Sequence, residues 1–228
     1  VEVRLKTGDQ HCDTLCQPFG LRTITRDGIG LRLNGHPVYL RGACEHHYFP
    51  LTCMPPSDVG SYRAIIRKFK MLGFNWLRCH TWVPSEEYLR AGDELGMMFQ
   101  VEAPVGFGAA EWMDILRTGR RHPSVVIYCC GNEELLDDPK IAFLREMASL
   151  CHQHVPDALF NPQEGLLGVE YFYTRENLGP DAVDQPYPHN PRRRAALKEF
   201  SDVLGSYAWT LLSYESARGD WRLIEERL

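Results

Sequence analysis

Several marks of common protein classes are missing from this sequence. No apolar run approaches the roughly 20 residues that a membrane-spanning helix needs, and the N-terminus lacks a basic segment followed by an apolar stretch. Positive charge is not in excess either, since the formal net charge is −5. These absences argue against membrane insertion and against a nucleic-acid surface. They predict a soluble protein that is cytoplasmic, or exported if a leader has been removed.

The spacings of common metal and phosphate sites are also missing. The eight cysteines are scattered without a CxxC pair, which argues against a disulfide framework and favours packing as small hydrophobic side chains. CEHHYFPLTC at 44–53 gathers two cysteines and two histidines, but not at the spacing of a zinc site, so we expect no bound metal. No GxGxxG or GxxxxGK[ST] follows an apolar run, which argues against a nucleotide site.

The sequence does contain strand-like and helix-like segments in a regular order. The first 42 residues indicate β-structure, with alternation over 1–5 and a hairpin, LRLNGHPVYLRG, turning at Asn34 and Gly35. Beyond residue 57, helical periodicity alternates with short apolar runs. The predicted helices lie at 57–72, 85–95, 110–118 and 138–152, and the predicted strands at 74–79, 97–101, 124–130 and 158–162. Residues 193–228 hold further helical or mixed segments.

This alternation predicts an α/β fold with a parallel sheet, because parallel neighbours need helical crossover connections. An open doubly wound sheet and a closed (β/α)8 TIM barrel both satisfy it. The missing phosphate-binding motifs favour the barrel. In a barrel, functional side chains stand at the carboxyl ends of the strands.

Polar side chains follow four successive apolar runs of the sequence. The first run is expected to end near Arg41 and to lead into Glu45, His46 and His47; the others lead to Arg78 and His80, to Glu102, and to Asn132 and Glu133. Each residue alone also fits a structural role, Arg78 as a buried ion-pair partner or a glutamate as a helix cap. Because barrel strand ends converge on one mouth, the set together predicts a site.

The composition of this predicted mouth suits a neutral polyhydroxylated ligand. Aromatic faces, Trp82 and Tyr171 among them, would stack on sugar C–H surfaces while carboxylates and amides bind hydroxyls. Glycoside cleavage needs one protonated carboxyl group and a second ionised one. Glu133, which ends an apolar strand, is the residue whose pKa such surroundings would raise.

Four motifs of the chain together resemble the catalytic barrel of glycoside hydrolase family 2, which includes β-galactosidases, β-glucuronidases and β-mannosidases. They are LNGHPVYLRG at 33–42, KMLGFNWLRCH at 70–80, YLRAGDELGMMFQVEAP at 88–104 and RHPSVVIYCCGNE at 121–133. The resemblance implies that residues 1–25 are the tail of a preceding β-sandwich domain. Residues 26–228 would then be the barrel domain, truncated at its C-terminus.

The resemblance also assigns roles to the site residues. It implies a retaining glycosidase without a cofactor, in which Glu133 is the general acid/base and Asn132 binds the hydroxyl next to the anomeric carbon. Arg78 would support the nucleophile. The remaining residues that it places in the sugar site are His46, His80 and Glu102.

The family's nucleophile, a glutamate that ends the seventh strand, has no clear counterpart here. Glu215 in LLSYES is the candidate, with Glu164 and Glu170 ranked below it, and otherwise the nucleophile lies beyond residue 228. A second departure is local: the family often has Asn-Arg where this chain has Cys44 and Glu45.

Two other functions stay open at this stage. One is a carbohydrate-binding or scaffold barrel that does not hydrolyse its ligand, because it lacks the nucleophile. The other is a metal-dependent hydrolase that uses His46, His47, His80 and Glu102. The expected partner in the leading interpretation is an oligosaccharide or glycoside, and an incomplete barrel with exposed sheet edges predicts self-association into a homo-oligomer.

Overall fold

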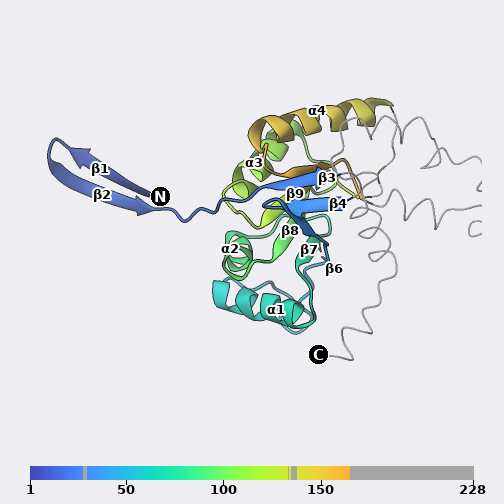
Figure 1. Ribbon diagram of the computed structural model, residues 1–228, viewed down its shortest axis with the longest axis horizontal. Helices are drawn as coiled ribbons and strands as arrows, with labels where there is room; N and C mark the ends of the chain where they lie inside the picture. The colour runs from blue at the N-terminus through green and yellow to red at the C-terminus, as the bar shows by residue number, and fades with distance from the viewer. Residues whose placement is uncertain (28–29, 133, 135–137, 165–228) are drawn as a thin grey trace, which may run out of the picture.

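A computed structural model describes residues 1–27, 30–132, 134 and 138–164 of the 228-residue chain. At its N-terminus β1 (Glu2–Thr7) pairs antiparallel with β2 (Gln10–Cys16), which agrees with the alternation of residues 1–5. The left-handed backbone of Gly8, with φ of 61°, permits the tight connection between them. Every residue of both strands is exposed, and the hairpin projects away from the rest of the molecule (Figure 1).

A small antiparallel sheet of three strands follows the hairpin. It consists of β3 (Ile24–Asp27), β4 (Gly30–Leu33) and β5 (His36–Val38). The predicted turn joins β4 to β5, with φ of 51° at Asn34 and 78° at Gly35. Ile24 and Leu31 are buried in the main core. The proposed domain boundary between residues 25 and 26 falls within β3 and stays a prediction.

Five parallel strands form the main sheet of the described residues. They are β6 (Gly42–Glu45), β7 (Trp76–Cys79), β8 (Met98–Glu102), β9 (Val125–Cys129) and β10 (Leu159–Asn161). Each strand pairs with the next one in the chain, so the order β10-β9-β8-β7-β6 contains no reversal. A doubly wound sheet reverses its order at a switch point, whereas a barrel adds strands in sequence. The observed order is that of a barrel.

The first strand of this sheet begins later than expected. Arg41 precedes β6, and its carbonyl accepts hydrogen bonds from the backbone N–H groups of Asn75 and Trp76. Gly42 then lies so close to Trp76 that a Cβ atom would stand 2.4 Å from the Trp76 carbonyl oxygen. The strand therefore ends at Glu45 rather than near Arg41. This shift brings Cys44 level with Arg78 in the parallel register.

Four helices alternate with the strands of this sheet, as the periodicity predicts. They are α1 (Val59–Met71), α2 (Glu86–Leu95), α3 (Ala109–Gly119) and α4 (Asp138–His154). Asp58 and Ser85 cap the N-termini of α1 and α2, and Gly96 ends α2 in the left-handed conformation with φ of 66°. Within the described ranges, none of the helices is long and apolar enough to cross a membrane.

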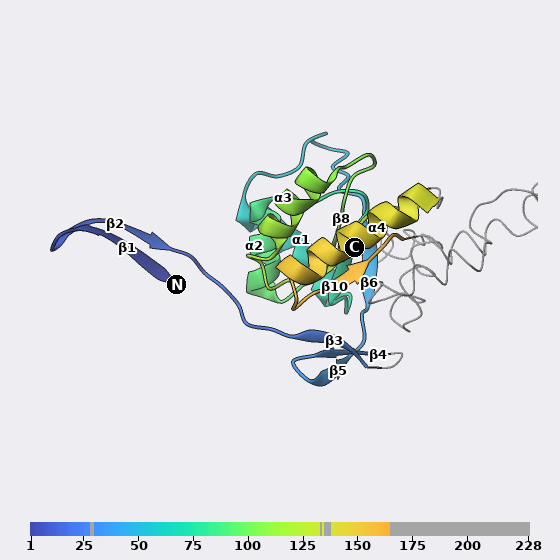
Figure 2. The same ribbon diagram turned by 90° about the horizontal axis from the view of Figure 1, so that it is seen from above.

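The helices pack next to one another outside the sheet, α1 against α2 and α3 against α4 (Figures 1 and 2). Between helices and sheet lies one continuous apolar core. β7, β8 and β9 are buried along their whole length, which is why their sequences are mostly apolar; the exceptions are the buried polar residues Arg78, Gln100 and Glu102. The largest fully buried side chains are Trp112, Tyr62, Tyr88, Tyr128, Phe99 and Phe160.

Candidate functional site at the carboxyl ends of the strands

Arg78 on β7 forms a buried ion pair with Glu102 at the end of β8. Its Nε donates to Glu102 Oε2 over 2.9 Å and its Nη2 donates to Oε1 over 3.1 Å. The side chains are only 4% and 0% exposed. Burial acts to raise the pKa of Glu102, but the guanidinium outweighs it and holds this pKa below its ordinary value. Glu102 is therefore an ionised carboxylate in the interior.

The same guanidinium joins the ends of four strands. Its Nη2 also donates to Asn132 Oδ1 after β9 and lies 3.1 Å from His80 Nδ1 after β7, while its Nη1 lies 3.9 Å from Cys44 Sγ on β6. Because a guanidinium can only donate, His80 Nδ1 is the acceptor in its contact with Arg78. The predicted convergence of Arg78, His80, Glu102 and Asn132 is thus present in the structure.

A second group of side chains supports this centre from the β6 side. Glu45 accepts from the backbone N–H of His47 over 2.7 Å and from the hydroxyl of Tyr88 over 3.3 Å. Trp82 Nε1 donates to the Glu45 carbonyl over 2.9 Å, and its ring stacks on His47 with centroids 4.0 Å apart. Burial raises the pKa of Glu45 and lowers that of His47. In this structure His47 therefore packs with aromatic rings and supports the Trp82 side chain.

His46 contacts a different set of rings from His47. Its ring lies 4.7 Å from that of His80 and stacks on Tyr48 at 5.6 Å. Burial, together with the neighbouring His80 and Arg78, lowers the pKa of His46, so the ring is neutral near pH 7. A cavity of about 830 Å³ opens beside these residues and is lined by 45–50 and 53–55.

Glu164 is a buried carboxylate, and from the sequence it was only a minor candidate for the nucleophile. It follows β10, is 0% exposed, and its Oε1 accepts from Gln100 Nε2 over 2.7 Å and from Asn161 Nδ2 over 2.8 Å. Its backbone N–H donates to the Gly131 carbonyl, and its charge helps to raise the pKa of Arg78. The pattern of an apolar strand followed by a carboxylate, already used for Glu102, would also have selected Glu164 for the site.

Three of the predicted site residues lie outside the described part of the chain. These are Glu133, Glu215 and Tyr171. Their assigned roles stay predictions. The next residue after Glu133, Glu134, is described, and its carboxylate forms an ion pair with Lys140 at 2.6 Å.

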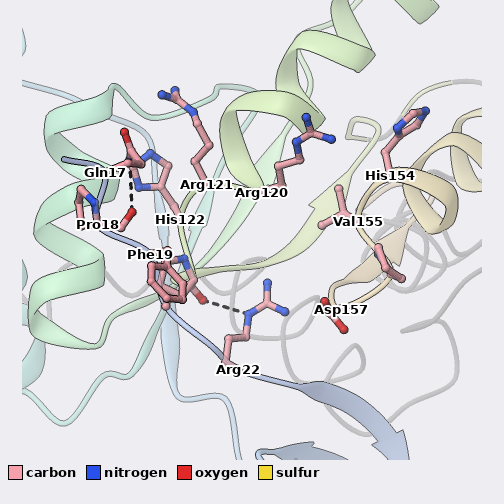
Figure 3. A pocket seen from close by; sticks show the side chains of 13 residues that line it. Gln17, Pro18, Phe19, Arg22, Arg120, Arg121, His122, His154, Val155 and Asp157 are labelled. Carbon is pink, nitrogen blue, oxygen red and sulfur yellow. Dashed lines mark hydrogen bonds between the residues drawn. The ribbon is translucent and has the colours of Figure 1, made fainter. Parts of the chain in front are cut away.

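A second cavity, of about 440 Å³, lies at the other end of β9 and β10 (Figure 3). It is lined by residues 17–20 and 22 of the N-terminal segment, by 120–123 before β9, and by 154–157 before β10. Arg22 donates from Nε to the Pro123 carbonyl over 3.0 Å and from Nη2 to the Val125 carbonyl. Since barrel sites form at the carboxyl ends, we assign this cavity to the attachment of the N-terminal segment.

The sequence and the fold were compared with those of known proteins. No protein-family model matches the chain. A curated β-galactosidase of Thermoanaerobacter pseudethanolicus is 28% identical over 165 residues, which are 67% of this chain and 22% of that protein. The chain thus spans about a fifth of this relative's length.

Solved structures give the same result. The β-glucuronidase of Parabacteroides merdae superimposes with a TM-score of 0.60 and 26% identity, over 70% of this chain and 22% of that one. A glycosyl hydrolase family 2 member of Bacteroides cellulosilyticus has a TM-score of 0.61 and 26% identity, over 72% of this chain and 24% of that one. The predicted α/β barrel fold is confirmed by these neighbours and by the strand order. These relatives and solved structures confirm the resemblance of the four motifs to glycoside hydrolase family 2.

Proposed function

We propose that the protein carrying this chain is a retaining glycosidase that hydrolyses terminal β-glycosidic bonds, with Glu133 as its general acid/base. The observation that supports this most strongly is the arrangement around Arg78, which brings polar groups from the ends of β6, β7, β8 and β9 to one edge of the sheet. Glu133 follows Asn132 directly in the sequence. The relatives above are named as β-galactosidase and β-glucuronidase.

The orientation of Asn132 suits the role proposed for it. Its Oδ1 accepts from Arg78, a group without acceptor atoms, so the amide must turn its oxygen toward the guanidinium. The NH2 group then points away from Arg78 and can donate to a sugar hydroxyl. Arg78 itself is held by Glu102, so the amide is positioned through two consecutive contacts.

The proposed mechanism follows the two-carboxyl chemistry of retaining enzymes. Glu133 would protonate the leaving-group oxygen while a second carboxylate, about 5 Å away, attacks the anomeric carbon. Glu133 would then act as a base and deprotonate the water that releases the sugar. Glu164 is not suited to be the nucleophile, because it is fully buried and already accepts from two amides. Glu215 or a residue outside this chain is left for that role.

Azide rescue tests this proposal. The purified protein and its Glu133→Gln variant are assayed on aryl β-galactoside, β-glucuronide and β-mannoside, with and without azide. We expect turnover by the wild type on one of these sugars, a large loss in the variant, and recovery with azide as a β-glycosyl azide. Glu134→Gln is the matched control, because its carboxylate pairs with Lys140, and it should retain turnover. Absence of wild-type turnover on all three substrates would favour the binding barrel that does not hydrolyse its ligand.

A further inference from the structure

Cys44, His46 and His80 place three metal-ligating atoms together at the mouth. The Cys44 sulfur and one nitrogen of each imidazole all lie within 4.8 Å of one another. Cys44 is on β6 and His80 follows β7, and the parallel register sets these two strand ends side by side. Family 2 often has asparagine at the position of Cys44, so the thiol is a feature of this chain that its glycosidase chemistry does not require. The zinc hypothesis drawn from the sequence included His47 and Cys53, which are not members of this cluster.

The distances are close to those of a bound cation. A tetrahedral zinc ion with one sulfur ligand at about 2.3 Å and two nitrogen ligands at about 2.1 Å holds its ligand atoms roughly 3.5 Å apart. Atoms that lie within 4.8 Å of one another therefore need to approach by only about 1 Å. All three side chains are partly exposed, so an ion can reach them and the rings can adjust.

The surroundings match a metal site as well. A metal-bound histidine usually donates its second ring nitrogen to a carboxylate, which fixes the ring and makes it a better ligand. His80 Nδ1 lies 3.5 Å from Glu102 Oε1, so binding through Nε2 with the proton moved to Nδ1 would create this arrangement. When His80 Nδ1 becomes a donor, Arg78 loses it as an acceptor but still donates to Glu102 and Asn132.

Both kinds of ligand can take the protonation state that binding needs. A neutral imidazole offers one ring nitrogen with a lone pair. A thiol binds as the thiolate, so coordination of Cys44 releases its proton to the solvent. The thiolate then bonds to the metal without any change of oxidation state.

We propose that Cys44, His46 and His80 bind a thiophilic divalent cation of the Zn²⁺ class, with a fourth position open to the mouth. We further infer that the bound cation blocks the sugar, because His46 and His80 are the residues expected to line the sugar site. Only this second statement rests on the proposed function. Such a site makes the cation an inhibitor.

Cobalt titration of the reduced, full 228-residue chain tests the site directly, because Co²⁺ takes the place of Zn²⁺ and reports its ligands by absorption. We expect a sulfur-to-cobalt charge-transfer band that saturates at one equivalent and disappears when Zn²⁺ is added. Cys44→Asn, the residue frequent in the family, should abolish the band and weaken cobalt binding by more than about 100-fold, the upper range for losing an outer-shell partner alone. Cys53→Ser is the control, because Cys53 is exposed and outside the cluster, and it should leave the band unchanged.

Two results would overturn the site: a band that persists in Cys44→Asn, or no band in the wild type. Far-ultraviolet circular dichroism confirms that each variant is folded. A competition experiment then tests separately whether the bound cation blocks the sugar. The cobalt titration is repeated with the monosaccharide whose aryl glycoside is turned over, and this sugar should weaken cobalt binding. A cobalt site that is insensitive to this sugar would refute the block. Turnover of aryl glycosides without any cobalt site would refute the inference and leave the proposed function in place.

Discussion

Replacing Glu102 by glutamine is expected to destabilise the protein strongly, because it leaves the Arg78 guanidinium buried without its carboxylate. Both side chains are almost inaccessible, and two hydrogen bonds of 2.9 and 3.1 Å join them. Removing one partner of a buried ion pair typically costs about 3–5 kcal/mol. The glutamine oxygen can still accept one bond and the charge of Glu164 is near Arg78, so we expect the lower end, about 3 kcal/mol. At about 2–4 °C per kcal/mol, the melting temperature should fall by roughly 6–12 °C.

Urea and thermal unfolding, followed by circular dichroism, measure this loss. The matched control is Glu94→Gln, which removes the partner of Arg63 from a solvent-exposed pair with an Nη2–Oε1 distance of 2.9 Å. Exposed pairs contribute little, so the control should unfold almost as the wild type does. If Glu102→Gln is no less stable than Glu94→Gln, then Arg78 does not depend on Glu102 and the reasoning about the site's centre is wrong.

The structure makes two further predictions about stability. Burial acts to lower the pKa of His122, but Asp93 at 2.7 Å, together with Glu86, outweighs it and raises this pKa above 6.5. The stabilisation by charged His122 is therefore fully present below pH 6.5 and is lost as pH rises through the folded-state pKa. His122→Gln should flatten this part of the plot of unfolding free energy against pH. An unchanged slope in the variant would contradict the assignment. Gly42→Ala should cost about 1–3 kcal/mol in urea unfolding, because the new Cβ meets the Trp76 backbone oxygen at 2.4 Å, which cannot move aside like a side chain. Gly108→Ala, which meets no atom within 4 Å, is the control, and an equal loss in both variants would refute the steric explanation.

Much of the fold could be predicted because its local signals agree with its packing. Ser85 and Gly96 mark the ends of α2, and the apolar run of β9 reflects burial on both faces. The start of β6 could not be predicted. It depends on the contact between Gly42 and Trp76, which are 34 residues apart, and no local pattern reports such a contact.

The sequence predicts which residues belong to the site better than it predicts the contacts that each of them makes. Residues at strand ends are visible in the sequence, and the barrel rule brings Arg78, Glu102 and Asn132 together. The different roles of His46 and His47 could not be predicted, because two neighbouring histidines look alike in a sequence. Stacking on Trp82 distinguishes His47, and Trp82 comes from a different loop.

The most direct test of the central claim is how the effect of losing Glu133 depends on the leaving group. The measurement compares kcat/KM of the wild type and of Glu133→Ala on aryl β-glycosides of the sugar that is turned over, with phenols of increasing pKa as leaving groups. If Glu133 is the general acid, the loss is small for an acidic phenol, which departs without a proton, and grows as the phenol becomes more basic. An equal loss for every phenol, or no loss at all, would contradict the account.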